Sequence, residues 1–540
     1  MASTSLPAPA APARTVMGIQ RKWIVALSVT FGTLMGAIDS SIVNVALSQI
    51  RSAVGATTQE ITWISTGFAI ATVLVMPLTG FLGRLFGQKN VYLFCLVLFV
   101  AGSALCGIAW SLPSLVAFRV IQGFGAGALQ PTEQAILRQT FPPAEQGTAM
   151  ALFSVAVMVG PAFGPTLGGW IVDNYHWSWI FFINLPVGVL GFFMVWKFVE
   201  EPEDVRLAMK ADAERQRRNM DWLGIALLWT TLIALQFLLE EGQSHDWFES
   251  NLIVAMFLLA IFGGVAFVIR ELSAPAPAVN LRLFLDRTFA TGTLVMAAVM
   301  SILMSGMFLL PLFMQELLGF TAMQSGLALM PRTLVMVFVM PLVGKFYNRF
   351  SPAVFAAVGL GLAAYGQFML SGLTLQSSAH DVWGSIILQG VGMSMMFVPL
   401  STVALSTVPR HQLSDATGLS SLLRQIGGSM GLAALSTLLT RYNIAATESL
   451  KWQLSPERPE VAATLRATAA GAMARGMDPV AAQTAALASL AGRVAREGAV
   501  IGFEKTLAIG AILFLAVSPL VLLLRAPKSA APPVHVEIEV

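Results

Sequence analysis

Long apolar stretches separated by short polar ones recur along most of the 540-residue chain. Each holds about 20 residues, enough for a helix to cross roughly 30 Å of hydrocarbon. The pattern therefore predicts an all-α polytopic membrane protein with about fourteen transmembrane helices. The expected spans are 23–46, 60–82, 91–110, 114–136, 148–172, 178–197, 222–239, 251–269, 289–313, 324–347, 352–374, 382–405, 415–437 and 500–524.

Composition agrees with this class, because 56% hydrophobic and 11% charged residues with a mean hydropathy of +0.74 exclude a water-soluble core and shell. The net charge of +3 does not indicate nucleic acid, since the basic residues lie in predicted loops. Cys95 and Cys106 lie about 16 Å apart along one expected helix, too far for a disulfide. The five histidines are scattered. We therefore expect no metal site and no cofactor.

Lysine and arginine concentrate in alternate loops, whereas the short loops between them show only Arg51. Because cytoplasmic loops are enriched in these residues, both termini are expected in the cytoplasm. Residues 1–21 are rich in Ala and Pro and lack the apolar core of a signal peptide, so we expect a disordered cytoplasmic tail. Residues 526–540 form a second expected cytoplasmic tail. Residues 440–499 form a long external loop.

An internal repeat organises the spans. The sequence MPLTG at 76–80 returns as MPLVG at 340–344, and QGFG at 122–125 returns as QGVG at 389–392. The repeat predicts two six-helix bundles, with substrate between them near the membrane midplane. The bundles cover residues 22–198 and 289–525, and 199–288 hold a charged connector and two inserted helices. Because the repeat steps over this inserted pair, we expect the pair to flank the core, face lipid and join the halves.

The first span contains a carboxylate, Asp39, and an ionisable group at membrane depth usually marks an ion or proton pathway. Arg119 in the fourth span lies at similar depth, the two being about 12 and 9 Å below the expected outer surface. An opposite charge favours ionised aspartate and desolvation favours the protonated form, so changing water access could bind and release a proton. The hypothesis is a proton-coupling pair. The alternative is a structural ion pair.

Three further charged residues within spans are candidates, namely Arg332, Arg424 and Glu133. Each is a possible further participant in the pathway. For Glu133, a solvated carboxylate near the cytoplasmic mouth is an equal alternative.

Candidate substrate-cavity residues combine polar and aromatic side chains. Aromatic and Met-rich surfaces suit promiscuous binding, because they repack around different ligands. For any single aromatic side chain, packing or lipid contact is the alternative. The candidates are Asn44, Gln122, Trp63 and Phe68.

Two sequence elements resemble signatures of the major facilitator superfamily. GFLGRLFGQK at 80–89 resembles its loop signature, with Gly80 and Gly87 at conformational positions, and RVIQG at 119–123 resembles its fourth-helix element. The family usually has an acid where this chain has Arg84, which puts the family's charge relay in doubt here.

A third element, GPAFGPTLGG at 160–169, resembles the helix-five motif of drug:proton antiporters. Glycines four residues apart form a smooth face for close helix contact, and prolines remove backbone donors and favour bending. The residues of this motif that we expect to serve packing and conformational change are Gly160, Pro161, Gly164, Pro165, Gly168 and Gly169.

Segments 39–47, 173–186, 246–248 and 424–429 resemble the fourteen-helix branch of these antiporters, and an EmrB-like multidrug efflux permease fits best. The resemblance implies proton-driven efflux of amphipathic or hydrophobic compounds across a bacterial inner membrane by alternating access. It also implies a periplasmic adaptor protein and an outer-membrane channel as partners. Export of one dedicated metabolite and a non-transporting membrane sensor are the alternatives. An enzyme is disfavoured, because no nucleophile–base pair is evident.

Overall fold

The computed structural model describes residues 15–16, 19–203, 205–207, 213, 216, 220–347, 349–454 and 458–521. The expected tail 526–540 and much of the charged connector lie outside these residues. Within the expected tail 1–21, strands β1 (Thr15–Val16) and β2 (Ile19–Gln20) pair antiparallel. The prediction of disorder is therefore wrong for these four residues, because backbone pairing gives them regular structure.

The described elements are almost entirely helical, as the apolar pattern predicts. The N-terminal half contains α1 (Arg21–Val54), α2 (Thr58–Ile61), α3 (Trp63–Val75), η1 (Met76–Leu78), α4 (Thr79–Phe86), α5 (Gln88–Gly107), α6 (Leu112–Thr140), η2 (Pro143–Glu145), α7 (Gln146–Asn174), α8 (Trp179–Phe182) and α9 (Asn184–Phe198). The inserted region contains α11 (Trp222–Glu241), η3 (Trp247–Glu249), α12 (Asn251–Ser273) and η4 (Leu281–Leu285). The C-terminal half contains α13 (Arg287–Glu316), α14 (Ala322–Phe346), α15 (Pro352–Leu370), α16 (Ala379–Ala404), η5 (Arg410–Gln412), α17 (Leu413–Gln453), α18 (Pro459–Met473) and α19 (Pro479–Val521).

Thirteen helical segments of the described chain are long and apolar enough to cross a membrane. The remaining expected span, 415–437, lies within α17, which is not among the thirteen. Its sequence there includes Arg424, Gln425 and several serines, which lower its hydropathy. It nevertheless packs against α6, α13 and α19. Contact with other helices, and not lipid, therefore accommodates its polar side chains.

The two halves repeat the same helix packing. Gly125 of α6 lies against the backbone of Phe99 in α5, and Gly392 of α16 lies against the backbone of Ala363 in α15. Phe99 and Ala363 are 264 positions apart, and Gly125 and Gly392 are 267 apart. These are the two offsets of the sequence repeat, so the repeat corresponds to equivalent helix contacts.

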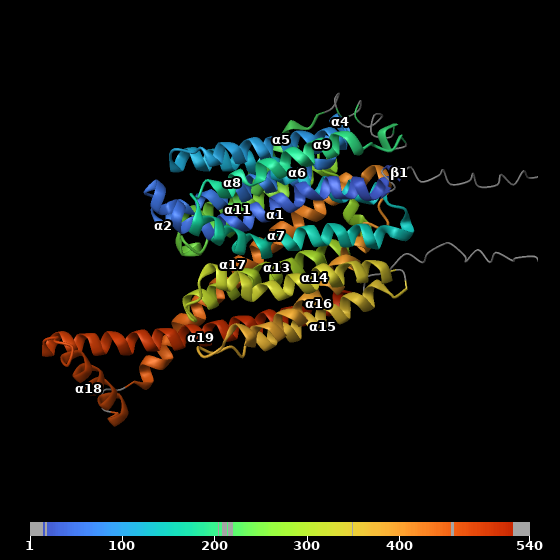
Figure 1. The fold of residues 1–540 in the computed structure, drawn as a ribbon. Helices are drawn as coiled ribbons and strands as arrows, with labels where there is room; N and C mark the ends of the chain where they lie inside the picture. The colour runs from blue at the N-terminus through green and yellow to red at the C-terminus, as the bar shows by residue number, and fades with distance from the viewer. Residues whose placement is uncertain are drawn as a thin grey trace, which may run out of the picture.

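The halves meet along α7 and α14, which lie side by side between the N-terminal helices above and the C-terminal helices below in Figure 1. Gly147 and Gly344 bring the two backbones together near one end, and Thr166 packs on Gly326 near the other. We call the ends of the bundle the β1 end, which carries β1, and the arm end opposite it.

The arm is formed by the last part of α17, by α18 and by the first part of α19, and it projects from the bundle in Figure 1. It occupies the expected external loop 440–499, so that segment is helical and not an irregular loop. Its two helices α18 and α19 hold together through a small cluster of alanines: Ala469, Ala472, Ala482 and Ala486.

The inserted helices lie in two different environments. Helix α12 is largely exposed, and its Phe262 and Val265 side chains point outward. Helix α11 packs against α12, against α3 of the N-terminal half and against α17 of the C-terminal half. Helix α11 therefore contacts both halves.

Candidate functional site

A fully buried ion pair lies in the N-terminal half. Arg119 Nη1 of α6 is 2.5 Å from Asp39 Oδ2 of α1, and their side chains are 1% and 0% exposed. Each group is costly to bury alone, so their pairing offsets part of the desolvation free energy of both. The structure thus brings together the two residues predicted as a proton-coupling pair.

Two amides complete the coordination of the aspartate. Gln122 Nε2 and Asn184 Nδ2 donate to Asp39 Oδ1 at 2.8 and 2.9 Å. Gln122 Oε1 also accepts from Arg119 Nη1 at 2.8 Å, and Asn184 also donates to Ser103 Oγ at 3.0 Å. Arg119, Gln122 and Asn184 thus all donate to the carboxylate oxygens of Asp39.

Asn184, at the start of α9, was not predicted as a site residue. Its signal is an amide within an otherwise apolar span, inside a segment that carries the family resemblance. A single sequence does not indicate that α9 reaches Asp39 on α1, and only the packing of these helices makes that contact.

The expected cavity residues separate into two groups. Phe68 lies beneath the guanidinium of Arg119, 4.0 Å from its ring centroid, and Gln122 is fully buried at the ion pair. Trp63 is 40% exposed and its ring lies 5.9 Å from that of Phe237 of α11, tilted by 40°. Exposed Asn44 accepts a hydrogen bond from Ser65 at 3.2 Å. Phe68 and Gln122 therefore enclose the ion pair, whereas Trp63 and Asn44 lie near the arm end.

Arg332 and Arg424 are buried cations of the C-terminal half. Arg332 Nη1 donates to Gln389 at 3.3 Å, and Arg424 Nη2 donates to Ser421 at 2.7 Å. Arg424 Nη1 is buried without a hydrogen-bond partner among the described residues, and its guanidinium lies 5.6 Å from the ring centroid of Phe153 in α7. Neither arginine forms an ion pair within the described chain.

Glu133 of α6 lies toward the β1 end and is 0% exposed. The alternative of a solvated carboxylate at the mouth of the bundle is therefore wrong. Helices packed against α6 cover this part of its surface, which the apolar pattern of one helix does not reveal.

The glycine motif of α7 faces α1. Added Cβ atoms at Gly160, Gly164 and Gly168 would collide with Ala37, Ser41 and Ile42 of α1. Gly169 is different, because its added Cβ would meet nothing closer than 3.7 Å. Helix α7 is continuous through Pro165, which is half-buried, and the side chain of Pro161 lies outside the described residues. Close packing thus depends on the three glycines spaced four apart.

An ion pair joins the halves at the β1 end. Arg84 of α4 pairs with Asp415 of α17 and also donates to Gln216 at 2.7 Å. Gly80 allows this approach, because its added Cβ would lie 2.8 Å from the Cα of Asp415. In this ion pair the base lies on the N-terminal half and the acid lies on the C-terminal half.

Further contacts close the same end. Arg138 Nη2 donates to the carbonyl of Leu405 at 2.7 Å, and Arg410 Nη2 donates to that of Gln139 at 2.6 Å. Gly87 turns the chain after α4 with φ +85, a conformation that favours glycine. The β1 end of the bundle is therefore held shut by polar contacts between the halves.

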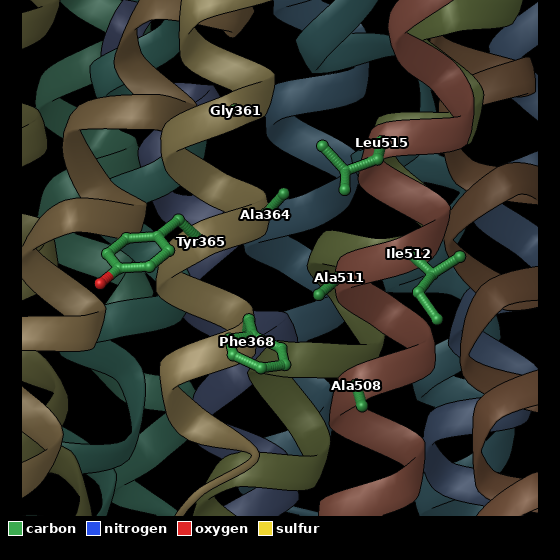
Figure 2. A pocket seen from close by; sticks show the side chains of 8 residues that line it. All are labelled: Gly361, Ala364, Tyr365, Phe368, Ala508, Ala511, Ile512 and Leu515. Carbon is green, nitrogen blue, oxygen red and sulfur yellow. The ribbon is translucent and has the colours of Figure 1, made fainter.

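A surface groove between α15 and α19 lies apart from these charges (Figure 2). Its lining is apolar except for the hydroxyl of Tyr365. The side chains of Tyr365, Phe368, Ile512 and Leu515 are exposed. It supplies no charged or catalytic group. Within the described chain, no cluster of His, Cys, Asp or Glu could hold a metal ion.

The profile of the Major Facilitator Superfamily matches residues 29–432. The chain belongs to this family. It is therefore a multi-pass membrane transport protein and not an enzyme, and the fold prediction is confirmed. The solved structure of the human organic anion transporter MFSD10 has a similar fold over 93% of this chain and 99% of its own, at a TM-score of 0.58 and 15% identity.

Curated relatives in the superfamily include exporters and resistance proteins. "Fatty acid resistance protein FarB" of Neisseria gonorrhoeae is 34% identical over 510 residues, covering 94% of this chain and 97% of the relative. "Multidrug export protein EmrB" of Haemophilus influenzae is 35% identical over 440 residues, covering 81% and 84%. The predicted resemblance to EmrB-like permeases is thus confirmed.

Proposed function

We propose that this superfamily member exports amphipathic or hydrophobic compounds from the cytoplasm in exchange for protons. The observation that carries the proposal is the buried pair of Asp39 and Arg119, the one carboxylate–guanidinium pair of the described helices that is fully enclosed. The names of the relatives, multidrug export and fatty acid resistance, support export as the direction.

Alternating access requires the two halves to separate at one end while they meet at the other. With the β1 end in the cytoplasm, the contacts of Arg84, Arg138 and Arg410 hold the cytoplasmic side shut. Protonation of Asp39 would leave Arg119 without its counter-charge and weaken a contact that links α1 to α6. A proton arriving from outside therefore changes the free energy of the closed state, which is how coupling operates.

The C-terminal half suggests the substrate charge. Arg332 and Arg424 bring two guanidinium groups into the bundle without carboxylates, and an anionic substrate would offset that burial. Arg424 lies against Phe153 of the opposite half, where substrate is expected in this fold. We therefore propose amphipathic anions as preferred cargo, which agrees with the name of the Neisseria relative.

For location, we propose a bacterial inner membrane with both termini in the cytoplasm. The arm then projects into the periplasm, where it offers helical surface to the expected adaptor protein, which would connect to an outer-membrane channel.

Deleting residues 456–480 tests this role of the arm. The deletion should abolish resistance of cells to exported toxic compounds and leave transport in purified vesicles unchanged. Equal loss in both assays would contradict an adaptor role for the arm.

The test of the proposed function uses the full chain in proteoliposomes with an imposed proton gradient. Two permanently charged probes are compared, 1-anilino-8-naphthalenesulfonate as the anion and ethidium as the cation. Gradient-driven transport with preference for the anion is the expected result. Movement of neither probe, or movement indifferent to the gradient, would contradict the proposal, and transport of one narrow chemical type in a wider panel would favour a dedicated exporter.

A further inference from the structure

Glu133 differs from Asp39 in having no cation beside it. One of its oxygens, Oε1, lies 3.0 Å from the hydroxyl of Thr30 on α1. The other, Oε2, is buried, and the hydroxyl of Thr33 on the next turn of α1 is the polar group that faces it. A carboxylate in such a place is costly, and neutralisation is the usual outcome.

The number of protons available for hydrogen bonds around Thr30 also favours a neutral Glu133. The Thr30 hydroxyl lies 2.8 Å from the carbonyl oxygen of Ala26 and 3.0 Å from Glu133 Oε1. A hydroxyl carries one proton, so it can donate to only one of these two acceptors. Both contacts are hydrogen bonds when Thr30 donates to Ala26 and Glu133 itself donates to Thr30. That arrangement requires a protonated Glu133.

Among the described residues, one ionisable side chain interacts with Glu133. Tyr92 of α5 interacts with it electrostatically, but the tyrosine hydroxyl already donates to the carbonyl of Val29 at 2.6 Å. From α1 only the hydroxyls of Thr30 and Thr33 face the carboxyl. On α6 itself, the guanidinium of Arg138 is engaged with carbonyls of the C-terminal half.

The charges of α17, which also packs on α6, are engaged elsewhere, and α7 brings no ionisable side chain to this depth. Asp415 pairs with Arg84, and Arg424 lies against Phe153. No described group therefore compensates a negative charge on Glu133.

The position relative to Asp39 gives this carboxyl a place in the cycle. Thr30 and Asp39 are about 13 Å apart along α1, with Glu133 on the β1 side. Between them, Thr33, Gly36 and Ser40 share one face of α1 by their spacing. An added Cβ at Gly36 would meet nothing within 4 Å, and Ser40 is exposed. The proton route proposed below follows this face from Asp39 toward Glu133.

We propose that Glu133 is a second proton-binding residue, which holds the transported proton on the cytoplasmic side of Asp39. The inference rests on the proposed proton exchange. The proton reaches Glu133 along the α1 face while the β1 end is shut. When the contacts of Arg84 and Arg138 open, water reaches the carboxyl, which releases the proton to the cytoplasm and becomes a carboxylate.

The first test is infrared spectroscopy of the purified full chain near neutral pH, which detects the C=O band of a protonated carboxyl without any substrate. Wild-type protein and Asp39→Asn should show this band. Glu133→Gln should lose one component of the wild-type band, while buried Glu271 contributes a component that both proteins share. Glu133→Asp should shift the component that Glu133→Gln loses. A wild-type-minus-Glu133→Gln difference spectrum without a C=O component would overturn the proposal.

The second test uses 1-anilino-8-naphthalenesulfonate and compares two rates in the same proteoliposomes. One is transport driven by a proton gradient. The other is exchange of the probe inside for the probe outside without a gradient. Glu133→Gln should lose about tenfold or more of the driven transport and keep exchange within about twofold, because only proton transfer is removed. Glu133→Asp should restore much of the driven transport. The matched control is Glu145→Gln, which removes a carboxylate bound to Lys22 at the β1 end and should change neither rate.

Two outcomes would contradict the role proposed for Glu133, and one would contradict the proposed proton exchange. Undiminished driven transport in Glu133→Gln would show that the carboxyl carries no proton in the cycle. Equal loss of exchange and driven transport, without recovery in Glu133→Asp, would show a structural role. Wild-type transport that ignores the gradient would instead refute the proposed function, while the infrared result would stand by itself.

Discussion

The two halves of the molecule share their helix packing and differ in their buried charges. Gly123 approaches the backbone carbonyl of Phe68, and its counterpart Gly390 approaches that of Arg332. The place of Phe68 is thus taken by a cation in the second half. The place of Arg119 is taken by buried Ile386, 267 positions later.

The equivalent glutamines show the effect of this difference in buried charge. Gln122 joins a carboxylate to a guanidinium, whereas Gln389 accepts from Arg332 and donates to Gln367 with no carboxylate present. Packing depends on small residues that let backbones approach, so duplication preserves it. Charge is independent of that constraint, so each half can carry a different chemical role: a paired acid in the first and unpaired cations in the second.

The largest expected effect comes from removing the acid of the first half. Asp39→Asn should reduce gradient-driven export by about a hundredfold, because the proton-binding group is lost while its amide can still accept from Arg119. Transport in proteoliposomes measures this. The matched control is Asp381→Asn, which removes an exposed carboxylate in the first turn of α16. This variant should transport at the wild-type rate. Full gradient-driven activity in Asp39→Asn would remove the functional distinction between the halves.

Equivalent packing should be equally sensitive in both halves. Gly164 faces Ser41 of α1, and Gly431 of α17 faces Ser301 of α13 in the second half. Gly164→Leu and Gly431→Leu should each lower turnover by about tenfold, because overpacking costs roughly 1–3 kcal/mol. Transport rates normalised to folded protein test this.

Gly169→Ala is the control for these two substitutions, since an added Cβ there would meet only ordinary contacts. It should retain wild-type turnover. Retention of wild-type turnover by only one of the two leucine variants would show that the halves do not share this packing constraint.

The cations of the second half should determine substrate charge. Arg424→Gln should weaken binding of 1-anilino-8-naphthalenesulfonate by about tenfold, since a hydrogen bond to a charged group contributes about 1.5–3 kcal/mol. Ethidium binding should not weaken. Fluorescence titration of both probes measures the contrast, with Arg466→Gln on the exposed face of α18 as the control. Equal weakening for both probes would indicate lost packing instead of lost charge.

The smallest effect is expected at the contact between the halves. Asp415→Asn removes the ion-pair partner of Arg84. The rate of probe exchange without a gradient should change by about fivefold or less, because Arg84 is partly exposed and other contacts at the β1 end remain. Exchanging the pair, with Arg84→Asp and Asp415→Arg together, should restore most of the wild-type rate. A double variant as impaired as the sum of its single variants would show that charge pairing is not what matters there.

Sequence alone determined the features that depend on local pattern. Apolar length fixes which segments can cross a membrane, and the recurrence of short motifs fixes the two-half organisation, because both are properties of neighbouring residues. A charge within an apolar span is equally visible, so Asp39, Arg119, Arg332 and Arg424 were all found in this way.

Tertiary structure alone decided which partners surround each buried charge. Asn184 donates to Asp39, Asp415 forms an ion pair with Arg84, and Glu133 is buried beside Thr30. Each of these contacts brings together helices that are distant in sequence. A single sequence gives the depth of a side chain in its helix but not the direction in which that helix faces. Whether a buried charge is compensated depends on that direction, so the difference between paired Asp39 and unpaired Glu133 exists only in the folded protein.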